Sequence, residues 1–197
     1  MKYQTLEAEA TSFHEVKGSK FYGYAVPFET EVAAFDYLAD LGAQHPKASH
    51  CCYGLTVGLN QLKVKSSDDG EPSRTAAGPI LQHIEGAGFH NILVAVVRYF
   101  GGVKLGKGGL ISAYGAAAKQ LLLNGTPIQK QEMTQVTVSV AYSNYPSLCH
   151  ALKQHDIAIY SEEYAATLCY LYLTIPSDET AYWREWLNNQ AIEALQL

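Results

Sequence analysis

The chain has 197 residues, of which 48% are hydrophobic and 17% are charged, and its formal net charge at pH 7 is −5. This length allows one large or two small domains with ordinary cores, and the composition excludes a largely disordered chain. We expect a cytoplasmic protein without a membrane span, because no signal-peptide pattern is present and no apolar run reaches the roughly 18 residues that cross a bilayer.

The charge is distributed unevenly along the chain. Residues 1–62 carry a net charge of −3, residues 63–119 carry +3, and residues 120–197 carry −5. This charge distribution argues against a long surface that binds duplex nucleic acid, because only one region of the protein is basic. The pattern favours a discrete phosphate site or a selective contact with ribonucleoprotein.

The first predicted elements are a strand, a helix and a second strand. Residues 18–27 are rich in aromatics and end at proline, which is typical of a strand. Thr30 is placed to cap a helix over residues 31–41, where apolar side chains recur at helical spacing, and Gly42 is expected to end it. Strand character returns over residues 50–59.

The next segment leads to the centre of the expected sheet. Residues 66–72 form a polar turn, and a short helix follows with Pro79 in its first turn and Gly86 at its end. Residues 92–97 are six consecutive apolar residues, which indicates a strand buried on both faces. A helix is predicted over residues 110–123.

A polar stretch at residues 129–132 is interpreted as a linker between two domains, residues 1–128 and residues 132–197. The second domain alternates strands with helices, and the predicted elements are strands near 136–140, 157–164, 168–175 and 192–197, a helix from Asn144 to His155, and a helix capped by Ser177. The order βαββαβ is that of a ferredoxin-like fold. The predicted fold class is therefore α+β in two domains.

The segment from Arg98 to Leu110 places five glycines and two lysines between the buried strand and the following helix. Glycines allow a ligand to approach the main chain, and a helix N-terminus favours an anion. The alternative is that these glycines serve only a tight turn or close packing of helix on sheet. The predicted phosphate- or nucleic-acid-binding residues are Arg98, Tyr99, Gly101, Gly102, Lys104, Gly106, Lys107, Gly108 and Gly109.

Four further residues could support this site: Asp68, Asp69, Glu71 and Arg74. Arg98 can hold a phosphate, or it can pair with one of the three carboxylates and fasten the acidic turn. The two aspartates could ligate magnesium, but Asp-Asp-Gly is also an ordinary turn sequence, and the structural role is favoured.

Catalytic and metal-binding patterns are weak. The Walker A pattern fails because Gly108 stands where a serine or threonine is required, and neither a Gly-x-Ser-x-Gly elbow nor a His-Glu-x-x-His motif occurs. A zinc site built from His45, His50, Cys51 and Cys52 lacks a second ligand cluster at the usual spacing. We therefore expect no catalytic residue, no metal and no cofactor.

Several short motifs occur together in a consistent order. They are Lys17-Gly18-Ser19-Lys20-Phe21, His45-Pro46-x-Ala48-x-His50-Cys51, the acidic turn, Arg-Tyr-Phe-Gly-Gly at 98–102 and Lys-Leu-Gly-x-Gly-Gly-Leu at 104–110. Over residues 12–123 the chain resembles the YigZ/IMPACT family. The resemblance implies an N-terminal α+β domain related to the second domain of ribosomal protein S-five and a C-terminal ferredoxin-like domain similar to one in elongation factor G.

The resemblance also implies a role in the regulation of translation. The leading hypothesis is a non-enzymatic protein that binds RNA or the ribosome, and the alternative is a small-molecule phosphate-ligand or phosphotransfer enzyme that uses the glycine-rich loop. One departure concerns the acidic turn, because Arg74-Thr75-Ala76-Ala77 stands where the family usually has Gly-Thr-Ala-Gly. If those glycines allow a ligand to approach the backbone, this chain binds it differently or not at all.

Overall fold

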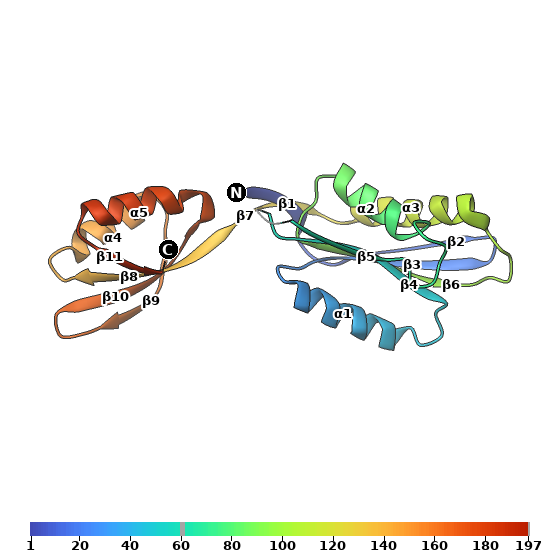
Figure 1. The fold of residues 1–197 in the computed structure, drawn as a ribbon, viewed down its shortest axis with the longest axis horizontal. Helices are drawn as coiled ribbons and strands as arrows, with labels where there is room; N and C mark the ends of the chain where they lie inside the picture. The colour runs from blue at the N-terminus through green and yellow to red at the C-terminus, as the bar shows by residue number, and fades with distance from the viewer. Residues whose placement is uncertain (60–61, 197) are drawn as a thin grey trace. The chain divides into compact units, whose positions relative to one another are not determined.

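The computed structural model describes residues 1–59 and 62–196, which form two compact units (Figure 1). The N-terminal unit comprises Tyr3–Lys130, and the C-terminal unit comprises Met1–Lys2 together with the chain from Gln131 onward. No helix in the described part of the chain is both long and apolar enough to cross a membrane.

The N-terminal unit is built on a five-stranded sheet with the order β2-β3-β6-β4-β5, in which all neighbours are antiparallel. Helix α1 lies on one face of the sheet, and α2 and α3 lie on the other (Figure 1). A separate pair of strands joins β1 to β7. The bounds are β1 Lys2–Leu6, β2 Ala10–Val16, β3 Ser19–Pro27, α1 Glu31–Gln44, β4 His50–Val57, β5 Lys63–Ser67, α2 Ala77–Gly86, β6 Ile92–Tyr99, α3 Gly106–Asn124 and β7 Pro127–Gln131.

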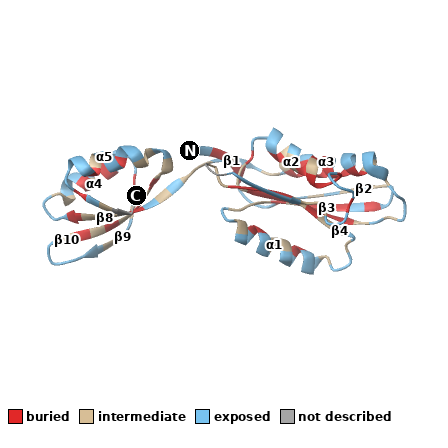
Figure 2. Ribbon diagram, viewed as in Figure 1, coloured by how far each residue is buried: buried red, intermediate tan, exposed pale blue. Residues whose placement is uncertain are grey.

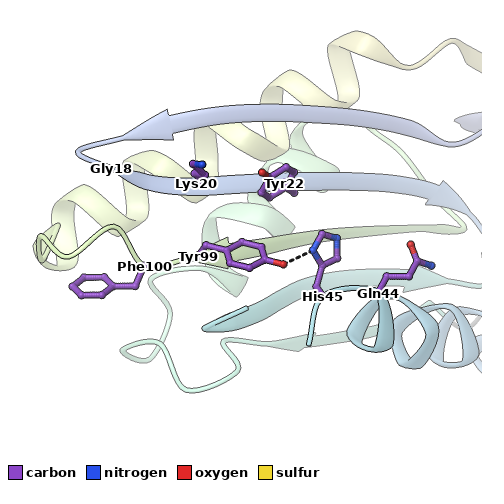
Figure 3. Close-up of a pocket in the computed structure, with 7 residues that line it drawn as sticks. All are labelled: Gly18, Lys20, Tyr22, Gln44, His45, Tyr99 and Phe100. Atoms are coloured by element: carbon purple, nitrogen blue, oxygen red, sulfur yellow. Dashed lines mark hydrogen bonds between the residues drawn. The ribbon is translucent and has the colours of Figure 1, made fainter. Parts of the chain in front are cut away.

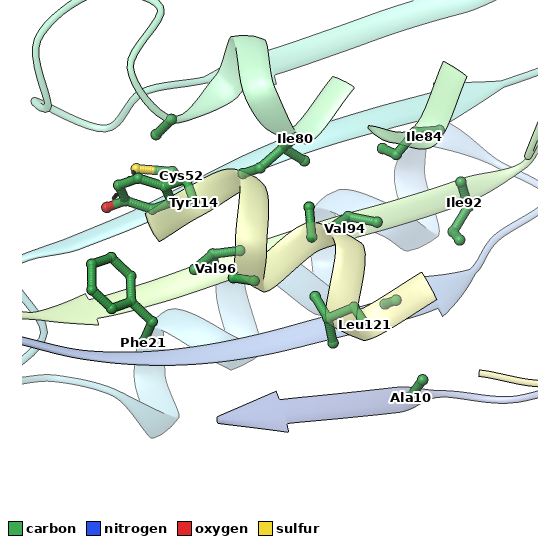
Figure 4. Close-up of a cluster of buried hydrophobic side chains, with 14 of the residues drawn as sticks. Ala10, Phe21, Cys52, Ile80, Ile84, Ile92, Val94, Val96, Tyr114 and Leu121 are labelled. Carbon is green, nitrogen blue, oxygen red and sulfur yellow. Dashed lines mark hydrogen bonds between the residues drawn. The ribbon is translucent and has the colours of Figure 1, made fainter. Parts of the chain in front are cut away.

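Strand β6 lies in the middle of this sheet and is buried from Ile92 to Arg98 (Figure 2). The expectation of a strand buried on both faces is therefore confirmed. Its residues alternate between two cores because successive side chains point to opposite faces. Val94 and Val96 pack with Phe21, Tyr114 and residues of α2 (Figure 4), and Ala95 and Val97 pack in the smaller cluster that contains Leu41 of α1.

Two predicted helix boundaries were wrong. Helix α1 continues through Gly42 to Gln44, and the backbone N–H of His45 closes it on the carbonyls of Leu41 and Gly42. Helix α3 begins at Gly106, four residues before the predicted start, so Gly106 to Gly109 form its first turn. Glycine has a low helix propensity, so a glycine-rich first turn is not recognised as helical from the sequence pattern. The cap at Thr30 is confirmed, because its Oγ1 accepts a hydrogen bond from the N–H of Ala33 at 3.2 Å.

Strands β1, β2 and β5 were not predicted, and the supposed linker at residues 129–132 lies mostly in β7. Strand β7 pairs with β1, which is more than 120 residues away in the sequence. Its polar composition reflects a partly exposed two-stranded ribbon rather than an unstructured linker. Such long-range pairing leaves no local signal in the sequence.

The C-terminal unit has a four-stranded sheet with the strand order β11-β8-β10-β9. Along the chain its elements follow the order β8, α4, β9, β10, α5 and β11, which is βαββαβ and confirms the ferredoxin-like prediction. Its core includes Val138, Leu171 and Trp183. Ser177 does not cap the last helix; it opens a 3-10 turn, Ser177–Glu179, that leads into it. The bounds are β8 Met133–Ala141, α4 Tyr145–Gln154, β9 Ile159–Tyr164, β10 Leu168–Pro176, α5 Thr180–Asn189 and β11 Glu193–Gln196, and Leu197 of the predicted final strand lies outside the described residues.

We propose that the two units are separable domains, with the boundary between residues 128 and 132. Trypsin should cut after Lys130 before it cuts after Lys119, because a short, partly exposed strand of a two-stranded ribbon opens more easily than a helix that is packed on a sheet. Lys119, which is exposed within α3, is the internal control. Mass spectrometry of a brief digest checks this, and a first cut at Lys119 would contradict the boundary.

Candidate functional site

A buried ion pair lies beside the glycine-rich segment. Arg98 is 5% exposed and Glu71 is 8% exposed, and Arg98 Nη1 donates to Glu71 Oε1 at 2.6 Å. Arg98 Nη2 donates to Ser19 Oγ at 3.3 Å in the same region. Of the two roles open to Arg98, the structure therefore shows pairing with the acidic turn, through Glu71 rather than either aspartate.

Tyr114 of α3 and Cys52 of β4 extend this network. The Tyr114 hydroxyl donates to Glu71 Oε1 at 2.8 Å, and the Cys52 thiol donates to Tyr114 Oη at 3.4 Å. Burial, the Cys52 thiol and the Glu71 carboxylate all raise the pKa of Tyr114, so the phenol stays protonated as a donor. Burial also raises the pKa of Cys52 to about 12, which leaves this thiol protonated at neutral pH.

Asp68 caps the N-terminus of α2, although it lies nine residues before Ala77, the first residue of this helix. Its Oδ1 accepts hydrogen bonds from the N–H groups of Ala76 and Ala77 at 2.9 Å, and its Oδ2 accepts from the N–H of Arg74 at 2.7 Å. Burial pushes the pKa of Asp68 upward, but the three backbone donors outweigh it and hold the pKa below its usual value. Asp68 is therefore engaged with the protein backbone.

Asp69 has a similar structural role, and its hydrogen-bond partners lie on strand β4. Its Oδ2 accepts from the N–H of Cys51, and its carbonyl accepts from His50 Nδ1, both at 2.6 Å. The two aspartates therefore hold the acidic turn against β4 and α2. Across residues 1–59 and 62–196, no group of three or more His, Cys, Asp or Glu side chains is arranged to hold a metal ion.

Arg74 adopts a left-handed backbone conformation with a φ of +61°. This conformation disfavours residues with a Cβ by roughly 1 to 2 kcal/mol and suits glycine, the residue that the family usually has here. Ala77, by contrast, is a buried residue in the first turn of α2. The two departures from the family pattern therefore lie in different backbone environments.

The glycines of the predicted site have different roles. A Cβ on Gly101 would lie 1.9 Å from the carbonyl carbon of Gly18, so this glycine permits two backbone segments to touch. Gly102 and Gly106 have positive φ values of +86° and +72°, and a Cβ there would meet no described residue within 4 Å. A Cβ on Gly108 would also meet open space, whereas one on Gly109 would contact Leu105 Cβ at 3.1 Å. Backbone geometry explains Gly101, Gly102 and Gly106, and none of these constraints explains Gly108.

The first turn of α3 borders a cavity of about 430 Å³, which we call the cationic cavity. Lys104 and Lys107 line it and are exposed, and Arg98 lies at its buried side. The residue before the helix, Leu105, provides no side-chain cap. The lining residues are His50, Glu71, Pro72, Arg98, Phe100, Lys104, Leu105, Gly106, Lys107 and Leu110.

Tyr99 lies apart from the other predicted residues. Its hydroxyl hydrogen-bonds to His45 Nδ1 at 2.8 Å on the face of the sheet that α1 covers, where it packs with Tyr22 (Figure 3). Arg98 points to the opposite face, toward Phe21 and Tyr114. The structure thus brings Arg98, Glu71, Lys104, Gly106 and Lys107 together around the cationic cavity and separates Tyr99 from them, and Gly108 and Gly109 are not among its described lining residues.

Sequence reasoning missed the roles of Tyr114, Ser19 and His50. Ser19 Oγ accepts from both Arg98 and the N–H of Gly101, and His50 Nε2 lies 3.9 Å from Glu71 Oε1. Ser19 and His50 stand inside the quoted motifs, which is the signal that could have drawn attention to them. Tyr114 stands between small residues of α3, in Ser-Ala-Tyr-Gly-Ala, where a tyrosine that packs on the sheet calls for a hydrogen-bond partner.

Replacement of Asp68 by alanine should destabilise the protein by about 1 to 3 kcal/mol at pH 7, because three backbone donors lose a charged acceptor. The folded pKa of Asp68 is lowered, so its contribution is present above the unfolded pKa of about 4 and is lost as the pH falls through the folded pKa. Urea unfolding of wild type and variant at pH 7 and pH 3 checks this. An equal difference at both pH values would contradict the role of the charge.

The single variants Arg74→Gly and Ala77→Gly, each of which restores a glycine that is usual in the family, should change the free energy of unfolding in opposite directions. Arg74→Gly should raise the unfolding free energy by up to about 1 kcal/mol, because it relieves a left-handed residue at some cost in chain entropy. Ala77→Gly should lower it by about 0.5 to 1 kcal/mol, since the residue is helical. Thermal unfolding of both variants tests this, and destabilisation by Arg74→Gly would show that its side chain has a stabilising contact.

Comparisons with known proteins agree with this architecture. The model of the Impact N-terminal domain family matches residues 17–122. The chain is 32% identical to the IMPACT family member YigZ of Escherichia coli over 96% of this chain and 94% of that protein, and 29% identical to YvyE of Bacillus subtilis over 88% and 81%. A crystal structure of a hypothetical protein matches all of this chain and 97% of its own with a TM-score of 0.74 and 29% identity. The protein belongs to the IMPACT family.

Proposed function

We propose that the protein is a non-enzymatic cytoplasmic binding protein that associates with RNA or the ribosome and takes part in the regulation of translation. The translational role follows from what membership of the IMPACT family implies. The observation that carries the binding proposal is the cationic cavity at the first turn of α3.

Three features of this cavity favour a phosphate group. The first N–H groups of a helix have no partner within the helix, and the helix dipole adds positive potential at that end. Lys104 and Lys107 extend from the same segment into solvent. Gly106, which lines the cavity, leaves open space above the main chain, so that a ligand can approach the amides.

The balance of charge supports an anionic ligand. Arg98, Lys104 and Lys107 line the cavity as cations, and Glu71 is the one carboxylate among the described lining residues. Glu71 is paired with Arg98, so the two lysines carry the excess charge.

A second candidate is a site for a small phosphate ligand, because a volume of about 430 Å³ lies within the range of roughly 300 to 1,000 Å³ typical of ligand pockets. Phosphotransfer needs a carboxylate that can accept a proton or hold a metal ion. Asp68 and Asp69 are bonded to backbone donors, and Glu71 already accepts from Arg98 and Tyr114. This engagement of the carboxylates favours binding over catalysis.

The double variant Lys104→Glu/Lys107→Glu should bind single-stranded RNA roughly tenfold or more weakly than wild type. The logarithmic salt slope should fall by about 1.4, at about 0.7 for each lost phosphate contact. Fluorescence anisotropy with a labelled RNA of mixed sequence, measured between low and physiological salt, provides both quantities.

The matched control is Lys119→Glu/Lys153→Glu, which changes the net charge by the same amount at two exposed positions outside the cavity. This control should retain most of the affinity. Equal loss in the two double variants would mean that only net charge matters. An unchanged affinity and slope in the cavity variant would exclude the cationic cavity as the contact surface, whereas competition by inorganic phosphate or a mononucleotide at micromolar concentration would favour the small-ligand alternative.

A further inference from the structure

A second depression lies on the other face of the sheet, where α1 ends (Figure 3). Its volume is about 600 Å³, and we call it the aromatic hollow. It is lined by Gly18, Lys20, Tyr22, Gln44, His45, Tyr99 and Phe100. Of these described residues, only Phe100 also lines the cationic cavity.

The rings of the hollow form a connected platform. Tyr22 and Tyr99 meet edge to face with centroids 5.7 Å apart, and His45 lies 5.8 Å from Tyr99. Next to the hollow, Phe13 pairs with Tyr22 across β2 and β3; the two rings are tilted by 47° with centroids 4.9 Å apart, and Phe13 is 54% exposed. Flat apolar rings open to solvent are the surfaces on which bases of single strands stack.

The platform also carries a polar group suited to a base edge. His45 hydrogen-bonds to Tyr99 Oη through Nδ1 and to Tyr24 Oη through Nε2, each at 2.8 Å. A neutral imidazole donates through one nitrogen and accepts through the other. One of the two tyrosines therefore receives the imidazole proton and keeps its own hydroxyl proton free to donate, and with the proton on Nδ1 that residue is Tyr99, which lines the hollow.

Phe100 joins the aromatic hollow to the cationic cavity. It is 49% exposed, and it lines both depressions. Its backbone N–H donates to Ser49 Oγ at 3.1 Å, and its ring lies 5.6 Å from the guanidinium of Arg98. A ligand that crosses this ring meets cations on one side and aromatic faces on the other.

We propose that the aromatic hollow receives an unstacked base of a single-stranded RNA whose phosphate occupies the cationic cavity, with Phe100 between them. This inference rests on the proposed function, because it assumes that the polyanion is RNA. Lys20 at the rim adds a cation for a second phosphate. A duplex does not fit this arrangement, since its bases are paired and stacked inside the helix.

The test compares three labelled probes of equal length: a single-stranded RNA, an abasic strand that has the same phosphates but no bases, and the same RNA in a duplex, which adds a second strand of phosphates. Anisotropy titrations of the wild type should show single-stranded RNA bound roughly five- to a hundredfold more tightly than the abasic strand. Phe100→Leu should remove most of this difference and leave the salt slope unchanged. Phe100→Trp keeps a stacking ring and should retain it.

Tyr160→Leu is the matched control, because Tyr160 is a similarly exposed aromatic residue, 55% exposed, outside the hollow. It should bind all three strands as the wild type does. Equal affinity of the wild type for single-stranded and abasic strands would overturn the inference and leave the proposed function standing. Equal affinity for duplex and single strand would also overturn it, and failure of every strand to bind would remove both.

Discussion

The ion pair between Arg98 and Glu71 is the interaction on which the candidate site depends. Both side chains are buried, so neither charge is stable there without the other, and removal of one partner of such a pair typically costs several kcal/mol. Tyr114 and Ser19 supply the further hydrogen bonds that buried charges require. The same Ser19 hydroxyl also holds the N–H of Gly101, so the position of the glycine-rich segment follows from the pair.

The network connects segments that are far apart in the sequence. Arg98 ends the central strand, Glu71 belongs to the acidic turn, Ser19 begins β3 and Tyr114 lies in α3. A change in any of these contacts therefore alters the cationic cavity from its inner side. This dependence explains why motifs separated by tens of residues occur together in the chain, because they contribute to one buried arrangement.

Much of the fold was accessible to sequence reasoning because its signals are local. Six apolar residues at 92–97 predicted the central strand, and Thr30 predicted a helix cap. The pairing of β1 with β7 was not predictable, since both strands are short and their partners are distant. The candidate site also could not be predicted fully from local sequence. Arg98 and Tyr99 are adjacent in the chain, which suggested that they act together. Neighbouring strand residues point to opposite faces of the sheet, however, so the two side chains have different partners.

The departure at residues 74–77 can now be placed in this arrangement. Arg74 is not among the described residues that line the cationic cavity, and its backbone N–H is bonded to Asp68. Its positive φ indicates that the glycine usual in the family serves the turn conformation. Ala77 donates its N–H to the same carboxylate, so a methyl group there does not disturb the cap. Arg74 therefore changes the strain of the turn that follows Glu71, and it reaches the cavity only through the position of that carboxylate.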